Sequence, residues 1–229
     1  MLPLRDTIPS RSFPIVTVLL IAANVAAFLF ERSLGPRLDE FFTTFALIPQ
    51  HFTNPADYPL RWTPVFVSMF LHGGLWHIAG NMLYLWIFGD NVEDRLGHLR
   101  YLIFYLLCGV GAALTHVFFE PGSPIPMVGA SGAIAGVLGA YFISYPRSRV
   151  LTWFPPIFLF HVPAVFFLGF WFVMQVLNGG MTLHAGYERA GGVAFTAHAG
   201  GFVAGVLLCV LLRPADRALP PRYDQDEES

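Results

Sequence analysis

Long apolar runs alternate with short polar strings along the 229 residues of this chain. Six runs have the length of a membrane-crossing helix, because a bilayer core about 30 Å thick needs about 17–25 helical residues. They cover, to within a few residues, 13–30, 71–88, 99–119, 129–145, 157–177 and 196–212. The pattern predicts an all-α polytopic membrane protein with an N-terminal segment over 1–12, a six-helix membrane domain over 13–212 and an acidic tail over 213–229.

The composition agrees with a membrane protein. Hydrophobic residues make up 55% of the chain and charged residues 12%, with a mean hydropathy of +0.58, whereas soluble domains carry about 25% charged residues. The formal net charge is −2 and the sequence has no basic patch, so we expect no nucleic-acid partner. Cys108 and Cys209 both fall inside apolar runs, which argues against a disulfide.

The placement of arginine predicts the orientation of the bundle. With the N-terminus in the cytoplasm, nine arginines fall in inner segments and four in outer segments, so we expect an N-in, C-in topology. The second, fourth and sixth helices then begin on the outer side, and these helices carry the unusual polar residues. The chain contains no lysine, which excludes a serine–lysine dyad.

Two small-residue strings open apolar runs and hold a serine and a histidine. They are Gly-Ala-Ser-Gly over 129–132 and Ala-His-Ala-Gly-Gly over 197–201. Ser131 and His198 each lie fourteen residues before the end of their run, about 21 Å along a helix, so both are expected about 9 Å below the membrane surface. Because histidine can accept the proton of a serine nucleophile, the pair predicts a catalytic dyad. The alternative is that both strings serve only close helix packing.

Small residues are expected to bring these two helices together. Gly132 and Ala135 follow Ser131 on the fourth run, and Gly201 and Gly205 form a GxxxG pair on the sixth. Such residues let transmembrane helices pack with their backbones close. We expect this contact to place His198 within hydrogen-bond distance of Ser131.

Helix two supplies candidate donors for an oxyanion. His77 and Asn81 are four residues apart and therefore share a helix face. Together with the backbone N–H of Ser131 at a helix N-terminus, they suit a developing negative charge. The alternative role is hydrogen bonding between helices, and for His72 we expect only a structural role. No acidic residue is placed to complete a triad, so we expect packing, and not a carboxylate, to orient His198.

The connecting segments differ in character. Residues 31–70 form a long, aromatic-rich loop that we expect to lie partly in the membrane interface. Residues 120–128 hold three prolines, which exclude a regular helix and predict a segment that dips into the bundle. The five glycines over 178–192 predict a mobile cap, and the acidic tail is expected to be disordered.

With these motifs in order, the chain resembles the rhomboid intramembrane serine proteases over residues 13–212. The resemblance rests on Phe-Leu-His-Gly-Gly over 70–74, the His77–Asn81 spacing, Gly-Asp-Asn-Val-Glu-Asp-Arg-Leu-Gly over 89–97, and the two strings that hold Ser131 and His198. It implies a six-helix bundle that cleaves transmembrane segments of other proteins. Ser131 would be the nucleophile and His198 the general base. His77, Asn81 and the Ser131 N–H would form an oxyanion hole, with Gly129 shaping the turn beside it.

The resemblance also implies a structural, non-catalytic role for Glu93 and Arg95. Three positions depart from the family pattern. Trp62 is followed by threonine and not by arginine, and Ala135 stands where an aromatic residue often stacks on the catalytic histidine. Gly80 stands where relatives can carry a bulky gating side chain, which predicts easier lateral access between helices two and five.

The leading hypothesis is an intramembrane serine endopeptidase that acts through an acyl-enzyme, with no metal and no cofactor. Its expected partners are transmembrane protein substrates and membrane lipid, and its oligomeric state stays open. We expect it in a bacterial plasma membrane with the active site toward the outer side. The alternative is a catalytically silent rhomboid-like protein that binds and escorts membrane clients. A transporter is disfavoured because we find no charged residue near the membrane midplane and no pair of related halves.

Overall fold

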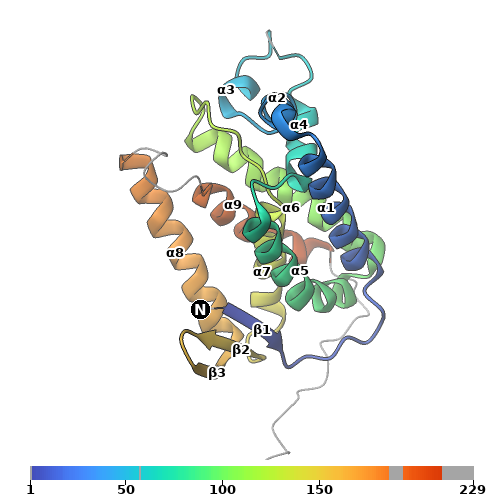
Figure 1. The fold of residues 1–229 in the computed structure, drawn as a ribbon. Coiled ribbons are helices and arrows are strands. Elements are labelled where there is room, and N and C mark those ends of the chain that lie inside the picture. Colours follow the sequence, from blue (N-terminus) through green and yellow to red (C-terminus); the bar gives the residue numbers. More distant parts are fainter. Residues whose placement is uncertain (1, 57, 186–192, 213–229) are drawn as a thin grey trace, which may run out of the picture.

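The computed structural model describes residues 2–56, 58–185 and 193–212, with no side-chain description over 182–185. Long helices form a bundle, a small sheet covers one end of it, and short helices cover the other end (Figure 1). The long helices are α1 (Ile15–Ser33), α5 (Leu75–Leu96), α6 (His98–Phe119), α7 (Ser131–Ser144), α8 (Ala164–Ala185) and α9 (Phe195–Leu212). The short ones are η1 (Gly35–Arg37), α2 (Leu38–Phe45), α3 (Pro49–Phe52), α4 (Trp62–Val67) and η2 (Ser68–Phe70).

Within the described ranges, four helices are long and apolar enough to cross a membrane, namely α1, α6, α8 and α9. The other two long helices differ from them in composition or length. Helix α5 carries Asp90, Glu93, Asp94 and Arg95 in its last two turns. Helix α7 has 14 residues and therefore a length of about 21 Å, less than a bilayer core. Six crossings and the N-in, C-in orientation stay predictions.

The chain is mostly helical, in agreement with the prediction, but three strands that the apolar pattern did not predict form an antiparallel sheet. They are β1 (Leu2–Asp6), β2 (Arg149–Phe154) and β3 (Phe158–Pro163), paired in the order β1-β2-β3. The predicted fifth span therefore begins at Ala164 and not at 157. Pro163 divides this apolar run and disfavours one continuous helix across it. The six residues before Pro163 form a run too short for its periodicity to separate a strand from a helix. Part of the N-terminal segment over 1–12 is strand β1.

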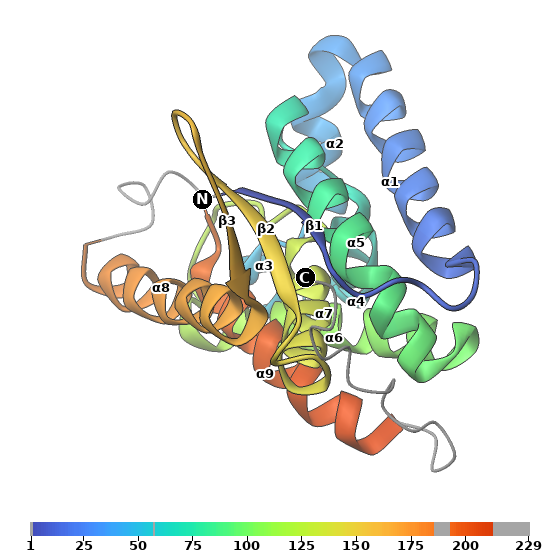
Figure 2. The same cartoon turned by 90° about the horizontal axis from the view of Figure 1, so that it is seen from below.

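Helix α7 lies at the centre of the bundle and contacts α5, α6, α8 and α9, as seen from below in Figure 2. Eleven of its 14 residues are buried. A helix that is apolar on all sides is typical of such a central position. This arrangement places Ser131, the first residue of α7, inside the bundle.

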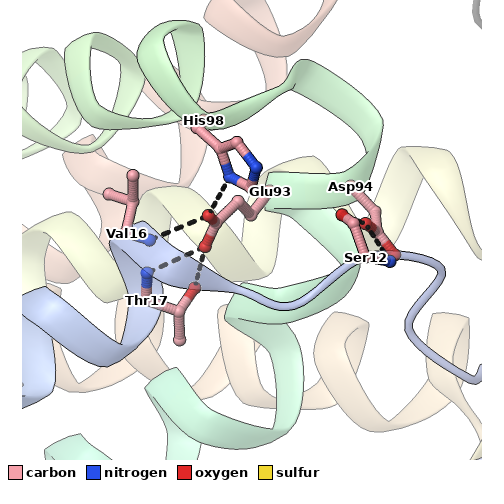
Figure 3. Close-up of polar contacts among 6 residues, drawn as sticks. All are labelled: Ser12, Val16, Thr17, Glu93, Asp94 and His98. Atoms are coloured by element: carbon pink, nitrogen blue, oxygen red, sulfur yellow. Dashed lines mark hydrogen bonds and ion pairs between the residues drawn. The ribbon is translucent and has the colours of Figure 1, made fainter.

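Glu93 on α5 caps the N-terminus of α1 from outside that helix (Figure 3). Its carboxylate accepts hydrogen bonds from the N–H groups of Val16 and Thr17, both at 2.8 Å, and from the Thr17 hydroxyl at 2.7 Å. His98 Nδ1 lies 2.5 Å from the same carboxylate. Asp94 accepts hydrogen bonds from the backbone and hydroxyl of Ser12. Since the first N–H groups of a helix have no partner within it, this geometry supports the structural role expected for Glu93.

The proline-rich segment over 120–128 contains no helix, as predicted, and it packs on the short helices. Leu47 and Met127 exchange two backbone hydrogen bonds, at 3.2 and 2.8 Å, and the Gly129 N–H donates to the Ser68 carbonyl at 2.9 Å. These contacts fix the chain just before Ser131. Of the predicted cap over 178–192, residues 178–185 belong to α8, and 186–192 lie outside the described residues, as does the tail over 213–229.

Candidate active site

Ser131 and His198 lie together, as their positions in the sequence predicted. Ser131 begins α7 and His198 lies in the first turn of α9. The distance between Ser131 Oγ and His198 Nε2 is 2.8 Å. With Nε2 unprotonated, the serine O–H donates to this nitrogen, which is the arrangement in which an imidazole can take the serine proton.

The close approach of α7 and α9 depends on glycine. A Cβ atom added to Gly201 would overlap the carbonyl oxygen of Gly132, and one added to Gly205 would overlap that of Gly136. In the other direction, a Cβ on Gly139 would overlap the carbonyl of Phe202. Backbone therefore meets backbone at three successive levels, which the GxxxG spacing predicted.

Gly132 and Ala135 contribute to packing in different ways. A Cβ on Gly132 would lie 2.6 Å from the Cβ of Ala112 on α6, so this glycine holds α7 against two helices. Ala135 is fully buried in the main apolar core. All four residues predicted for helix packing are therefore part of the interior of the bundle or of a close helix contact.

Two residues of α8 contact His198, and the sequence analysis missed both. Gln175 Oε1 lies 2.9 Å from His198 Nδ1, and the Trp171 ring is centred 5.8 Å from the imidazole at an interplanar angle of 33°. An amide oxygen can only accept, so Nδ1 carries the proton and Nε2 is left to accept from Ser131. This amide hydrogen bond adds to the packing that the sequence analysis expects to orient His198, and no carboxylate contacts the ring among the described residues.

Gln175 carried a signal that could have been used. It is the one carboxamide or charged side chain in the apolar stretch over 164–177, and such a residue inside a membrane helix needs a partner. Trp171 precedes Gln175 by one helical turn. Its ring supplies the aromatic contact with His198 that Ala135 cannot make.

His77 and Asn81 of α5 face the same region. Asn81 is buried, and its Nδ2 has no hydrogen-bond partner among the described residues. Gly129 has a φ of 125°, which disfavours any residue with a Cβ. A Cβ there would lie 2.8 Å from His77 Nε2 and 3.5 Å from Ser131 Oγ. Gly129 thus lets the His77 ring approach the serine.

His72 makes contacts of a different kind. Its backbone N–H donates to the buried Glu31 carboxylate at 3.1 Å, and its Nδ1 lies 3.3 Å from the Phe70 carbonyl oxygen. These contacts hold the turn before α5, in agreement with the structural role expected. Its ring meets that of His77 edge to face, with centroids 5.2 Å apart.

A cavity of about 780 Å³ joins these groups. Its walls come from α5, α7, α8, α9 and the segment over 126–129, and it contains all four polar residues of the predicted site, namely His77, Asn81, Ser131 and His198. Gly80 also lines it, and a Cβ on Gly80 would meet no atom of the described residues within 4 Å. The volume is in the range of about 300–1,000 Å³ that is usual for ligand sites.

The family model of the Rhomboid domain matches residues 59–215. The chain belongs to the rhomboid family. Among curated relatives of this rhomboid, Rhomboid protein 1, mitochondrial, of Saccharomyces cerevisiae is 28% identical over 192 residues, which are 82% of this chain and 50% of that protein. Presenilin-associated rhomboid-like protein, mitochondrial, of Bos taurus is 34% identical over 145 residues, 62% of this chain and 36% of that protein.

A bacterial protein is similar as well. Rhomboid protease GluP of Bacillus subtilis is 34% identical over 128 residues, 56% of this chain and 24% of that protein. This rhomboid thus spans half or less of the length of these curated relatives. Its apolar helices and its family make it an integral membrane protein. The expected bacterial plasma membrane draws no support from the yeast and bovine relatives, which are mitochondrial.

Proposed function

We propose that this rhomboid is an intramembrane serine endopeptidase that cleaves transmembrane segments of other proteins. The observation that carries the proposal is the 2.8 Å contact of Ser131 Oγ with His198 Nε2 inside a cavity between apolar helices. Holding such polar groups within a membrane bundle costs stability. A protein that only binds membrane clients has no need for this set, so the geometry favours the enzyme over the silent binding protein.

The reaction follows from the orientation of each group. Ser131 Oγ attacks the scissile carbonyl carbon while His198 Nε2 takes the hydroxyl proton. The imidazolium then gives this proton to the departing amine nitrogen, which leaves an ester on Ser131. A water molecule then attacks the ester carbonyl while His198 Nε2 takes a proton from the water. His198 gives this proton to Ser131 Oγ, which restores the free serine.

The oxyanion that forms in each half-reaction needs donors. We assign this role to Asn81 Nδ2, the His77 ring N–H and the Ser131 backbone N–H. The buried Nδ2 of Asn81 has no hydrogen-bond partner in the part of the chain that the structure describes, which supports this assignment, because such a donor is costly unless a ligand satisfies it. One donor of this kind is worth about 3–4 kcal/mol of the activation barrier. Gln175 is assigned as a positioning residue that keeps the proton of His198 on Nδ1.

A membrane substrate must enter the cavity from the side. Its walls include residues of α5 and α8, and we place the lateral entry between these two helices, beside Gly80. The segment to be cut must unwind there, because a helical peptide bond is shielded from attack. Replacing Gly80 by phenylalanine would fill the open space beside it and is expected to slow cleavage, and an unchanged rate would contradict this entry.

The test uses the purified protein in detergent with a fluorogenic transmembrane peptide and a serine-directed phosphonate. Wild type is expected to cleave the peptide and to be labelled. Ser131→Ala should neither cleave the peptide nor be labelled by the phosphonate, and His198→Ala should not cleave the peptide. Ser144→Ala is the matched control, because Ser144 is a buried serine at the other end of α7. Cleavage that persists in Ser131→Ala would refute the mechanism, and a wild type that binds the peptide without cutting it would favour the silent binding protein.

A further inference from the structure

A second cavity, of about 450 Å³, lies among the short helices that follow α1. It is lined by residues from α2, α3 and α4 and from the segments between them, over 43–48, 51–52, 58–61 and 63–64. It shares no lining residue with the active-site cavity. Because α1 ends at Ser33 and η1 follows at once, these short helices lie at the end of a membrane span. The cavity is therefore at the depth of the membrane interface.

Arg61 is the distinctive residue of this cavity. Among the described residues, none that lines the cavity is acidic and none forms a salt bridge with Arg61. The guanidinium carbon lies 5.5 Å from the centre of the Phe52 ring, and Trp62 meets the same ring edge to face at 5.0 Å. A half-buried cation against aromatic rings is stabilised by an anion that shares its surroundings.

The rest of the wall combines apolar surface with a few polar groups. His51 and Tyr58 stack at 3.9 Å and both line the cavity, together with the hydroxyl-bearing Thr63. Beside them, apolar side chains face outward, with Leu60 exposed to 77% and Trp62 to 48%. Exposed aromatic and aliphatic groups beside an arginine are typical of a surface that contacts the headgroup region of a bilayer.

We propose that this cavity binds an anionic membrane phospholipid. Its phosphodiester would pair with Arg61, whose planar guanidinium matches two phosphate oxygens. Tyr58 and Thr63 lie in the same wall and can donate further hydrogen bonds. The apolar wall would hold the first methylenes of the acyl chains. A zwitterionic lipid has the same phosphate but carries its own cation, so the site should prefer a lipid of net negative charge.

Binding can be measured without any reference to proteolysis. The full chain is placed in phosphatidylcholine nanodiscs, and retention of added phosphatidylglycerol is followed by native mass spectrometry, with thermal unfolding as a second readout. Wild type is expected to retain phosphatidylglycerol over phosphatidylcholine and to unfold at a higher temperature with it. Arg61→Gln should weaken the preference about tenfold, the effect of losing one charge-assisted contact.

Arg37→Gln is the matched control, because Arg37 is an exposed arginine at the end of η1 that does not line the cavity. It should leave the preference unchanged. Soluble glycerophosphoglycerol and inorganic phosphate test whether the cavity binds the lipid or only its phosphate. Neither should displace phosphatidylglycerol, even when added at the concentration at which phosphatidylglycerol saturates the cavity. Equal retention by wild type and Arg61→Gln, competition by free phosphate, or an equal loss in Arg37→Gln would each overturn the proposal. Unfolding in pure phosphatidylcholine checks that both variants are folded.

Discussion

The hydrogen bond between Gln175 and His198 yields the sharpest prediction. Gln175 is 8% exposed, and its Oε1 lies 2.9 Å from His198 Nδ1. Gln175→Leu keeps a similar volume and removes the acceptor. The Nδ1–H is then left buried without its partner, which costs about 1–3 kcal/mol. If this free energy is added to the activation barrier because the imidazole leaves its reactive orientation, the cleavage rate drops about 5- to 150-fold.

The assay is steady-state cleavage of a fluorogenic transmembrane peptide in detergent, with kcat and KM determined separately. Gln175 touches His198 and not the scissile bond, so the loss should appear in kcat with KM nearly unchanged. Gln175→Glu retains an acceptor oxygen and should restore most of the rate. Val176→Ala, at an exposed neighbour on the same helix, should have no effect.

Two results would refute this reasoning. A wild-type kcat in Gln175→Leu would mean that the hydrogen bond does not orient His198 during the reaction. An equal loss in the Leu and Glu variants, with lowered thermal stability in both, would mean that Gln175 only supports the packing of α8.

Three further predictions concern the scaffold. Gly205→Ala would press a methyl group into the Gly136 carbonyl and should cost about 1–3 kcal/mol, seen as a lower Tm together with reduced cleavage. A Cβ on Gly169 of α8 would make an ordinary contact, 3.7 Å from the Phe142 ring, so Gly169→Ala should leave both unchanged. Glu93→Gln weakens the cap of α1 and should cost about 1–3 kcal/mol in thermal unfolding, with active-site labelling by a phosphonate preserved in the folded protein. Burial raises the pKa of Asp6 from 3.8 to about 7, so the folded state holds this proton more tightly and its contribution to stability falls as the pH rises from about 4 through 7. Asp6→Asn should flatten that part of the Tm–pH curve, and an unchanged curve would contradict this origin.

The sequence by itself determined the parts of this protein that depend on local spacing. Helices α1, α6, α7 and α9 lie within a few residues of the apolar runs that predict them, and the four-residue spacing of Gly201 and Gly205 places both glycines on one face of their helix. Such a face can pack backbone to backbone against another helix, because small residues let the two helices approach closely. The pairing of Ser131 with His198 was therefore predictable, although 67 residues separate them.

Only the tertiary structure decided the features that join distant segments without a local pattern. Strand β1 pairs with β2 across about 145 residues, and the apolar run that holds β3 reads equally well as the start of a helix. Gln175 reaches His198 because of the rotation and depth of α8 against α9, and these are set by the packing of the whole bundle. Periodicity fixes which residues share a face of one helix, but not which neighbouring helix that face meets.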